Sequence, residues 1–582
     1  MGENEGKGAE EIFKEFREHS VAEFFKKNRQ MLGFSGSVRS LTTIIHEYVT
    51  NSLDACEEGG ILPDINIRVK VVEENGHVII SIRDNGPGIP REHIGKALGA
   101  MLAGTKFHRY MQQRGQQGIG ASGCTMFAQI TTGKPVHVKS GTGNGMAYEC
   151  DISTDFKTNA ANVTNLKEYR EDFRGLEVTG EFSEVKYDRS EHSVYEYLKR
   201  TAIANPHAKI VLVEPDGNRV VFQRAVEVVP ERPTLVQPHP LGLTTNDLME
   251  FSHHSKARKL ASFFMQEFVR FSDAKVKELQ DLLPHINMNK HPQELRWDEA
   301  EQIVKAIQKL KWIAPATDSL RPIGAEHIQK ALENILKPEF IEVSDRKPKI
   351  YRGGVPFIVE VGIAYGGNAG RKKIDGTNTG DLSRFANRAP LLFDTGGCAI
   401  TEAVKTVDWK RYDVKDFENE PITVFVNFVS VHVPYTGAGK QAISAEEEIL
   451  EEMRFAIMDV ARRIQLHVRG KRRDFEREAK RKAIIKYVER IVIDLSDLSR
   501  YKDSNELERR LKYLIDTKYS KALFDEEEAG HTWEQYNEKL DEMEDEENEK
   551  EERIREKVEA LKEESLAKAD EKAEKLEKKK KN

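Results

Sequence analysis

Residues 46–55 read HEYVTNSLDA, and this stretch gives the strongest indication of the fold. If it is helical, the side chains of Glu47, Asn51 and Asp54 share one face of the helix. A carboxylate beside an amide suits metal-assisted hydrolysis, because Glu47 can accept a proton from water and the Asn51 side-chain oxygen is a hard ligand suited to Mg²⁺. A solvated helix face is the alternative interpretation when the stretch is taken alone.

A hairpin and a glycine-containing turn follow this helix. Apolar residues alternate over positions 65–71 and again over 78–82, on either side of the turn EENG, which predicts two antiparallel strands. The second strand leads into DNGPGI, residues 84–89. Gly88 permits the close approach of a flat ligand, and Asp84 can accept a hydrogen bond from an exocyclic amine such as that of adenine. An ordinary Asp-Gly turn also explains this hexapeptide.

Two further glycine-containing segments come next in the chain. The first is GTKF, residues 104–107, and the second is RGQQGIGASG, residues 114–123. Four glycines in ten residues, at the start of an apolar helical stretch, can direct backbone N–H groups at phosphates. The pattern is not a Walker A motif, because G-x-x-x-x-G-K-[ST] is missing. Glycine loops are common, so this segment alone does not establish a nucleotide site.

In this order and spacing, the four segments resemble the GHKL ATPases, a superfamily that contains gyrase, a heat-shock chaperone, MutL and sensor histidine kinases. The resemblance covers about residues 40–130 and implies a Bergerat-type α/β sandwich that binds ATP and Mg²⁺. It makes Glu47 the general base, Asn51 the Mg²⁺ ligand and Asp84 the adenine acceptor. The other implied ATP-binding residues are Gly88, Thr105, Lys106, Gly115, Gln116, Gln117, Gly118, Ile119, Gly120, Ala121 and Ser122.

Three stretches far downstream narrow the family. They are PATDSLRPIG (315–324), SRFANRAPLLFDTGGCAIT (383–401) and WKRY (409–412). Together with the first four segments they are similar to the B subunits of archaeal type IIB DNA topoisomerase VI, across residues 20–470. That resemblance places the family's switch lysine, which reaches the γ-phosphate from a second domain, at Lys410. It also implies an ATP-dependent type II topoisomerase in which this chain carries the ATPase.

The same resemblance implies three kinds of partner. The first is an A subunit that carries the DNA-cleaving tyrosine, in an A₂B₂ heterotetramer. The second is another copy of this chain, which dimerises through the ATPase domain when ATP is bound. The third is double-stranded DNA, which the clamp captures and drives through a break in a second duplex, so that supercoils are relaxed and DNA is decatenated. Residues 465–520 are the predicted docking surface for the A subunit.

The chain is expected to be α+β and to divide into five segments. These are a GHKL ATP-binding domain with an N-terminal strap (1–228), a helical helix–two-turn–helix domain (229–311), an αβ transducer domain with a long stalk helix (312–475), a helical region that docks the partner subunit (476–524) and a charged tail (525–582). The tail has 23 acidic and 13 basic residues and almost no aromatic residues. Such a composition buries little apolar surface, so the tail is expected to be disordered or a lone solvated helix.

A long helix is predicted to start near residue 444. Its apolar stripe consists of Leu450, Met453, Ile457, Val460 and Ile464, at alternating spacings of three and four. Such a stripe fits either ordinary packing on a core or a coiled-coil seam. Ordinary packing is the favoured interpretation.

Composition narrows the class of protein. The net charge is -7 at pH 7. No apolar run approaches the roughly 20 residues that a membrane helix needs, and the polar N-terminal segment has no signal-peptide pattern. The four cysteines lack C-x-x-C spacing, which argues against a zinc knuckle or a disulfide framework. We therefore expect a cytoplasmic protein without a membrane partner.

Three alternatives share the nucleotide pocket. A heat-shock-like chaperone and a MutL-like clamp would both be expected to lack WKRY and NRAPLL, and both motifs are present. A non-hydrolytic ATP-gated scaffold would not need a general base, so the presence of Glu47 argues against that class.

Overall fold

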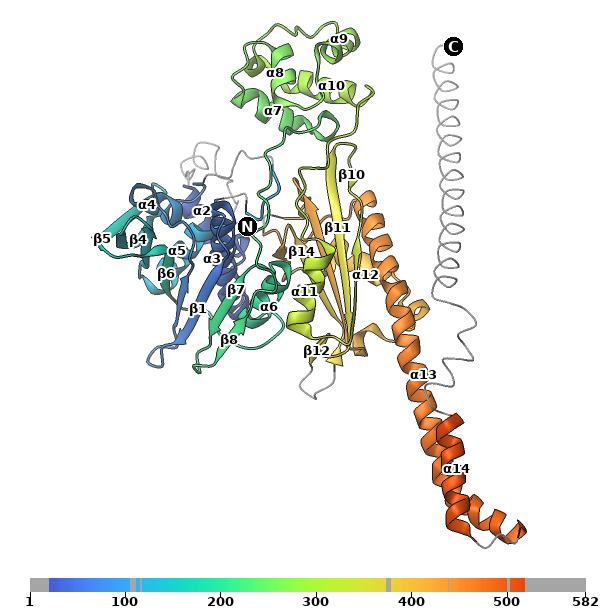
Figure 1. The fold of residues 1–582 in the computed structure, drawn as a ribbon. Coiled ribbons are helices and arrows are strands. Elements are labelled where there is room, and N and C mark those ends of the chain that lie inside the picture. Colours follow the sequence, from blue (N-terminus) through green and yellow to red (C-terminus); the bar gives the residue numbers. More distant parts are fainter. Residues whose placement is uncertain are drawn as a thin grey trace, which may run out of the picture. The chain divides into compact units, whose positions relative to one another are not determined.

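The structure, a computed structural model, describes residues 20–104, 111–115, 118–372, 378–437, 439–499 and 503–518. The chain divides into two compact units, Met1–Val468 and Arg469–Asn582. Figure 1 follows the elements along the chain. Within the described ranges, no helix combines the length and the apolarity that crossing a membrane requires. The charged tail, and with it the prediction of its disorder, lies outside these ranges.

An eight-stranded sheet forms one layer of the N-terminal region. Its strands, in the order in which they pair, are β5 (Ala160–Arg170), β4 (Met146–Asp155), β3 (Val136–Thr142), β6 (Arg174–Phe182), β2 (Val78–Arg83), β1 (Asp64–Val71), β7 (Lys209–Val213) and β8 (Arg219–Phe222). Neighbouring strands are antiparallel except for β1 and β7, which are parallel. The predicted hairpin is confirmed, because β1 and β2 pair with Val71 opposite Val78.

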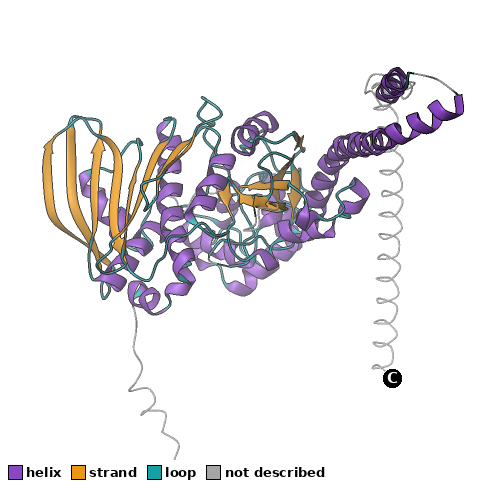
Figure 2. Ribbon diagram, turned by 90° about the horizontal axis from the view of Figure 1, so that it is seen from below, coloured by secondary structure: helices purple, strands orange, loops and turns teal. Residues whose placement is uncertain are grey.

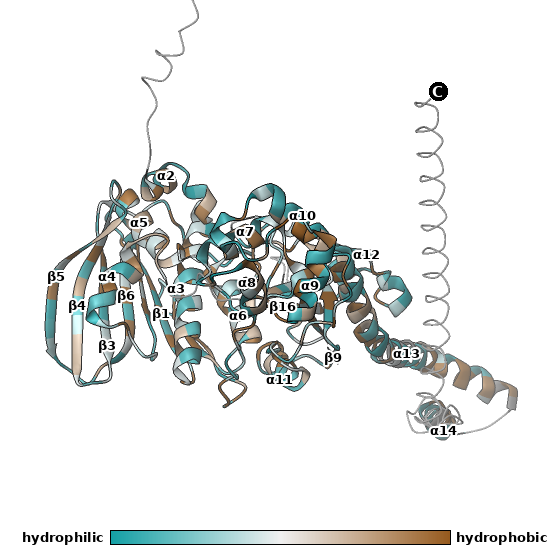
Figure 3. Cartoon of the chain, turned by 90° about the horizontal axis from the view of Figure 1, so that it is seen from above, coloured by the Kyte–Doolittle hydropathy of each residue, from teal (hydrophilic) through white to brown (hydrophobic). Residues whose placement is uncertain are grey.

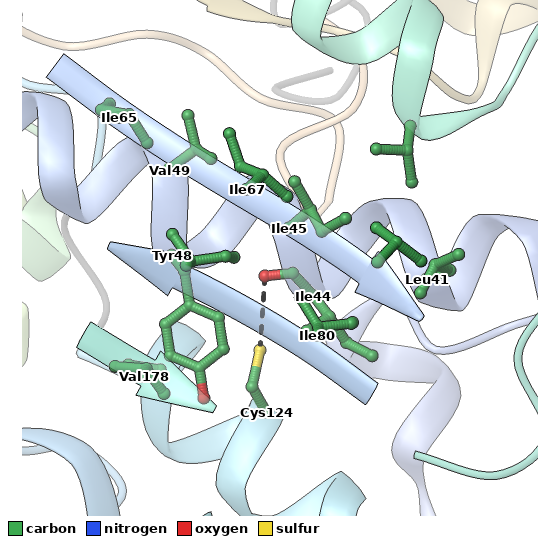
Figure 4. Close-up of a cluster of buried hydrophobic side chains, with 14 of the residues drawn as sticks. Leu41, Ile44, Ile45, Tyr48, Val49, Ile65, Ile67, Ile80, Cys124 and Val178 are labelled. Carbon is green, nitrogen blue, oxygen red and sulfur yellow. Dashed lines mark hydrogen bonds between the residues drawn. The ribbon is translucent and has the colours of Figure 1, made fainter. Parts of the chain in front are cut away.

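Helices form the second layer, on one face of this sheet (Figure 2). They are α3 (Ser37–Gly59), α4 (Arg91–Gly99), α5 (Gly120–Thr132) and α6 (Val194–Ala204), and a short α2 (Val21–Lys27) packs on α5. The apolar side of α3 lies over β1 and β2, as Figure 4 shows for Ile44, Ile45 and Tyr48 against Ile67 and Ile80. Burial of this side leaves the side of α3 that carries Glu47 and Asn51 for a ligand.

One strand of this sheet, β5, was not predicted from the sequence. β5 lies at the edge of the sheet and pairs only with β4. Its side chains are almost all exposed, so the strand has no alternation of apolar and polar residues for a sequence pattern to detect. β3 and β4 form a hairpin, in which Gly143 and Gly145 turn the chain with positive φ values of 77° and 80°.

Short helices form the middle region after an extended proline-rich segment. They are α7 (Thr245–His254), α8 (Leu260–Glu267), α9 (Asp273–Leu282) and α10 (Trp297–Ile307). Figure 3 shows hydrophobic and hydrophilic residues side by side on α7 and α10, as expected for amphipathic helices. Their common core is rich in aromatic rings, with Phe264 stacked on Phe271 at 5.0 Å between ring centroids.

A second sheet follows the helical middle region in the chain. It lies in the first unit, Met1–Val468. Its main path is β10 (Lys349–Tyr351), β11 (Val355–Tyr365), β16 (Ile422–Ser430), β14 (Asp381–Ala386) and β15 (Ala389–Pro390), and β9 (Phe340–Asp345) also pairs with β11. β11 and β16 are almost entirely buried, and their sequences VPFIVEVGIAY and ITVFVNFVS are accordingly almost continuous apolar runs. The helices α11 (Ala325–Leu336) and α12 (Ala399–Thr406) contact this sheet. The expected α+β fold class is therefore confirmed.

The long helix α13 (Glu447–Ser499) starts in the first unit and continues into the second. Within the first unit, Met453, Ile457, Val460 and Ile464 are all buried in the core of the second sheet. Leu450 is partly buried against the same core. The apolar stripe therefore packs on the protein's own sheet, as the sequence analysis favoured.

The described part of the second unit is helical. It contains the rest of α13 and α14 (Ser504–Lys518), and Arg481 on α13 donates to Asp516 on α14 at 2.8 Å. Several large apolar side chains on these two helices are exposed, among them Tyr487, Ile493, Leu498, Tyr513 and Leu514.

Candidate nucleotide-binding site

A cavity of about 370 Å³ opens beside α3, the loop after β2 and the start of α5. Residues from all of these elements line it. They include Glu47 and Asn51 on α3, Asp84, Gly88 and Ile89 after β2, Gly104, Gly115, Gly118, Ile119, Gly120 and Ala121 around the glycine loop, and Gly439, Lys440 and Gln441 from the second sheet's region. The structure thus brings together described residues from all four sequence segments, with Gly104 as the described residue of GTKF.

Glu47 lies directly against the first residue of α5. A Cβ added to Gly120 would stand only 1.8 Å from Glu47 Oε2, so no larger residue fits there without moving the carboxylate. Asn51, one turn further along α3, is exposed and lines the same cavity. The start of a helix presents free N–H groups and a positive dipole end, which favour a phosphate close to this carboxylate.

Asp84 is held in one orientation by three donors. Its Oδ1 accepts from the backbone N–H groups of Gly86 at 2.9 Å and Leu176 at 3.1 Å, and its Oδ2 accepts from the Ser52 hydroxyl at 2.6 Å. Burial raises the pKa of Asp84, and these hydrogen bonds oppose that rise. Because a carboxylate oxygen accepts two hydrogen bonds, Oδ2 keeps one acceptor position for a ligand.

The backbone conformation at position 88 and the lack of space around it require a glycine. Its φ is +72°, and a Cβ at this position would lie 2.2 Å from the carbonyl oxygen of Gly141. Gly141 belongs to β3, and a Cβ on Gly175 in β6 would similarly lie 2.1 Å from the Asp84 carbonyl oxygen. Asp84 and Gly88, which both line the cavity, are therefore held close to the backbones of β6 and β3.

The glycine loop is described in part. Gly115, Gly118, Ile119, Gly120 and Ala121 line the cavity. Ser122 does not, because its buried hydroxyl turns back and donates to the Ile119 carbonyl at 3.3 Å. Gln116, Gln117, Thr105 and Lys106 lie outside the described residues, so their predicted contacts stay predictions.

Lys410 is not at this cavity. WKRY forms a short 3₁₀ helix, Trp409–Tyr412, in which Trp409 packs on Phe417 at 5.0 Å and Tyr412 is buried. These aromatic anchors leave Lys410 exposed on the surface, and it does not line the nucleotide cavity. Lys410 therefore does not reach the cavity in this structure, and its assignment as the switch lysine stays a prediction.

Lys440 occupies the position that the sequence analysis gave to Lys410. It lies in the segment YTGAGKQ, residues 435–441, and lines the cavity together with Gly439 and Gln441. The nearby His46 has a lowered pKa, chiefly through burial, and the positive charge of Lys440 lowers it further, while Glu47 opposes this. A lysine in a glycine-flanked loop was the signal in the sequence that would have identified this residue.

Comparisons with known proteins agree with this architecture. Residues 36–155 match the family of histidine kinase-, DNA gyrase B- and HSP90-like ATPases, and residues 315–482 match the transducer of the topoisomerase VI B subunit. The B subunit of type 2 DNA topoisomerase 6 from Methanothermobacter thermautotrophicus is 48% identical over 480 residues, which is 82% of this chain and 91% of the relative. Its counterpart from Pyrococcus horikoshii is 44% identical over 556 residues, 88% of this chain and 97% of the relative.

The chain belongs to the topoisomerase VI B subunit family. The predicted resemblance is thereby confirmed, and this B subunit carries the ATPase domain of an ATP-dependent type II DNA topoisomerase. The alternatives of a chaperone, a mismatch-repair clamp and a scaffold are set aside. Among solved structures, the ATPase region of Saccharomyces cerevisiae topoisomerase II aligns with a TM-score of 0.37 at 12% identity, covering 78% of this chain and 99% of that one.

Proposed function

We propose that this B subunit hydrolyses ATP in the cavity between α3 and α5, with Glu47 as the general base. The observation that carries the proposal is the contact of the Glu47 carboxylate with the first residue of α5, because a phosphate held at this helix start lies beside the group that activates water. Asp84 would accept a hydrogen bond from the adenine amine through Oδ2. Lys440 would neutralise charge on the γ-phosphate.

Asn51 fits the role of a Mg²⁺ ligand. Its side chain is exposed at the cavity, one helical turn from Glu47, and an amide oxygen is a hard donor of the kind that Mg²⁺ accepts. Bound Mg²⁺ would shield the negative charge of the phosphates. Among the described residues, no cluster of three or more acidic, histidine or cysteine side chains forms a metal site of its own, so a site completed by the nucleotide's phosphates is the proposal.

ATP binding would close two B subunits into a clamp around one DNA duplex. The A subunit would cut a second duplex and accept the exposed end of the stalk in an A₂B₂ assembly. The exposed apolar side chains Tyr487, Ile493 and Leu498 on α13 and Tyr513 and Leu514 on α14 support this docking surface. They lie within residues 465–520, where the A subunit was expected to bind.

The division into five segments is part of the same proposal. The ATP-binding domain would cover residues 1–228, the helix–two-turn–helix domain 229–311 and the transducer with its stalk helix 312–475, followed by the docking region and the tail. We also propose the cytoplasm as its location. All four cysteines are free thiols in the structure, which suits a reducing compartment.

The purified chain should bind and hydrolyse ATP alone but should relax supercoiled plasmid only when an A subunit is added. Glu47→Ala should keep nucleotide binding and lower hydrolysis by about 10²–10⁴-fold, the usual contribution of a general base. Relaxation would be followed on gels and hydrolysis by phosphate release. Wild-type hydrolysis in Glu47→Ala would remove Glu47 from this role, and a covalent DNA adduct formed by this chain alone would overturn the division of labour.

A further inference from the structure

A second cavity of about 390 Å³ lies behind the glycine loop. Its walls come from α3, the segment before the loop, the proline-rich segment and the transducer, and include Glu57, Gln112, Arg114, Arg321, Asn387 and Arg388. Arg114 lines both this cavity and the nucleotide cavity. It therefore stands between them, one residue before the loop glycine Gly115.

Arg114 anchors the start of the glycine loop to α3, the helix that carries Glu47. Its Nη1 donates to Asp54 Oδ1 at 2.6 Å and to Glu57 Oε2 at 3.1 Å, and its Nη2 donates to Glu57 Oε1 at 2.7 Å. Nη2 also donates to Asn205 Oδ1 at 2.6 Å. Burial alone would lower the pKa of Arg114, but Glu57 and Asp54 raise it, so the guanidinium stays charged.

Glu57 is shared between the ATPase region and the transducer. Arg388, in the NRAPLL motif, brings its Nη1 to 3.9 Å from Glu57 Oε1, the oxygen that also accepts from Arg114. His207 Nε2 lies 2.9 Å from the same oxygen. The Glu57 carboxylate thus faces two arginines, one from the ATPase region and one from the transducer. Both arginines are buried.

Hydrogen bonds between side chains and backbone groups near this carboxylate join the ATPase region to the transducer. Gln112 donates to the Arg321 carbonyl at 2.9 Å and accepts from the Arg321 N–H at 2.7 Å. Asn387 donates to the Gln113 carbonyl at 3.2 Å. Arg388 Nη2 donates to the carbonyls of Arg321 and Pro322, each at 3.3 Å. The three residues just before the glycine loop are therefore all tied to α3 or to the transducer.

We propose that Arg114 is a positioning residue that couples the glycine loop to the transducer through the carboxylate of Glu57, which Arg388 shares. A nucleotide bound beside Arg114 and Gly115 displaces Arg114, which lines the same cavity, and a buried carboxylate cannot be left without its partner at low cost. Glu57 and Arg388 therefore follow Arg114, and with them the segments around residues 321 and 388. This inference rests on the proposed function, since it assigns a route by which nucleotide binding in that cavity reaches the transducer.

The test compares two buried ion pairs between the same two regions. Arg388→Gln removes the transducer's arginine from Glu57 and leaves Arg114 in place. Arg200→Gln is the matched control, because Arg200 on α6 donates to Asp381 on β14 at 3.0 Å and lines neither cavity. Arg200 and Asp381 are each 5% exposed, against 7% for Arg388, and Asp381 also keeps a second arginine, Arg371, at 3.3 Å.

Hydrogen exchange in the full chain, with and without a non-hydrolysable ATP analogue, reports the coupling. In the wild type and in Arg200→Gln, the analogue should change exchange in residues 315–324 and 385–392. In Arg388→Gln the analogue should still bind with wild-type affinity, but the change in these segments should fall at least threefold. With the A subunit added, Arg388→Gln should hydrolyse more ATP for each plasmid relaxed.

Arg114→Lys keeps the charge but cannot make the paired contacts of a guanidinium. It should weaken coupling in the same assay, and a wild-type response would overturn the proposal. An equal loss of response in Arg388→Gln and Arg200→Gln would also overturn it, because the contacts would then be general interface packing. Failure of the wild type to bind the analogue at all would instead reject the proposed function.

Discussion

The Glu47 carboxylate occupies the space that a side chain at position 120 would need, so these two residues of the candidate site depend on each other. A methyl group on Gly120 would overlap Glu47 Oε2, since the added Cβ would lie 1.8 Å from it. Gly120→Ala should therefore displace the carboxylate and lower ATP hydrolysis by about 10²-fold, the order expected for a catalytic group that is misplaced by about 1 Å. Phosphate release under saturating ATP measures the effect.

Gly115→Ala is the natural comparison for this variant. Gly115 belongs to the same glycine-rich segment, but a Cβ there meets no atom of the described residues within 4 Å and its φ is not positive. It should lose much less hydrolysis than Gly120→Ala. Similar losses in the two variants would show that the loop needs flexibility rather than space for Glu47.

Glu57 should make stability depend on pH in the acid range. Burial alone would raise the pKa of Glu57, but Arg114, His207 and Arg388 hold that pKa well below its usual value. In the unfolded chain the pKa of a glutamate carboxyl is about 4.3. The stabilisation is thus complete above that pH and is lost as pH falls toward the folded pKa, because only the unfolded state then takes up the proton.

Thermal midpoints measured from pH 6 down to pH 3 test this prediction. Other carboxylates also titrate there, so the informative quantity is the difference between the wild type and Glu57→Gln. The variant should be less stable at pH 6, and the gap should narrow as the pH is lowered. A gap that stays constant over this range would contradict a depressed pKa for Glu57.

At the scale of single elements, α13 provides two environments on one helix. Ile457 is fully buried against the second sheet, whereas Ile493 is 59% exposed. Ile457→Ala should lower the free energy of unfolding by about 2–5 kcal/mol, the usual cost of emptying a core site. Ile493→Ala should change it by less than about 0.5 kcal/mol. Denaturant unfolding of the full chain measures both, and equal effects would contradict the packing of the stripe.

The elements that hydrophobic periodicity predicted have one buried face. The strands β1 and β2 bury every second residue, and the stripe of α13 buries every third to fourth residue. The sequence therefore shows apolar residues at these spacings, which is how the elements were predicted. Almost all side chains of β5 are exposed, so the strand has no such signal. Its position is set by pairing with β4, which a local pattern does not encode.

The candidate site was predictable to the extent that its residues are neighbours in sequence. Glu47 and Asn51 share a helix face, so their meeting follows from local geometry. Lys440 comes from a loop almost 400 residues away, and only the packing of the second sheet's region beside α3 brings it to the cavity. The aromatic residues of WKRY drew attention to Lys410, yet Trp409 and Tyr412 serve packing and leave that lysine on the surface.

At the scale of the whole molecule, Lys440 is placed where the second sheet's region reaches the nucleotide cavity. Lys440 belongs to the segment that follows β16, and it lines the cavity of the N-terminal region. A lysine so placed can contact the γ-phosphate of ATP, whereas ADP has no γ-phosphate to contact. Its removal should therefore affect ATP-dependent steps more than the binding of ADP.

Lys440→Ala should lower ATP hydrolysis by about 10²–10³-fold, as expected when one preorganised charge is removed from the site of reaction. Affinity for ADP, measured by calorimetry, should change much less. Lys410→Ala is the matched control, a lysine of the same transducer that is exposed in its 3₁₀ helix, and without DNA it should hydrolyse ATP at close to the wild-type rate. If Lys410→Ala instead abolished hydrolysis while Lys440→Ala retained it, the switch would belong to WKRY, and the two regions would have to meet in an arrangement different from this one.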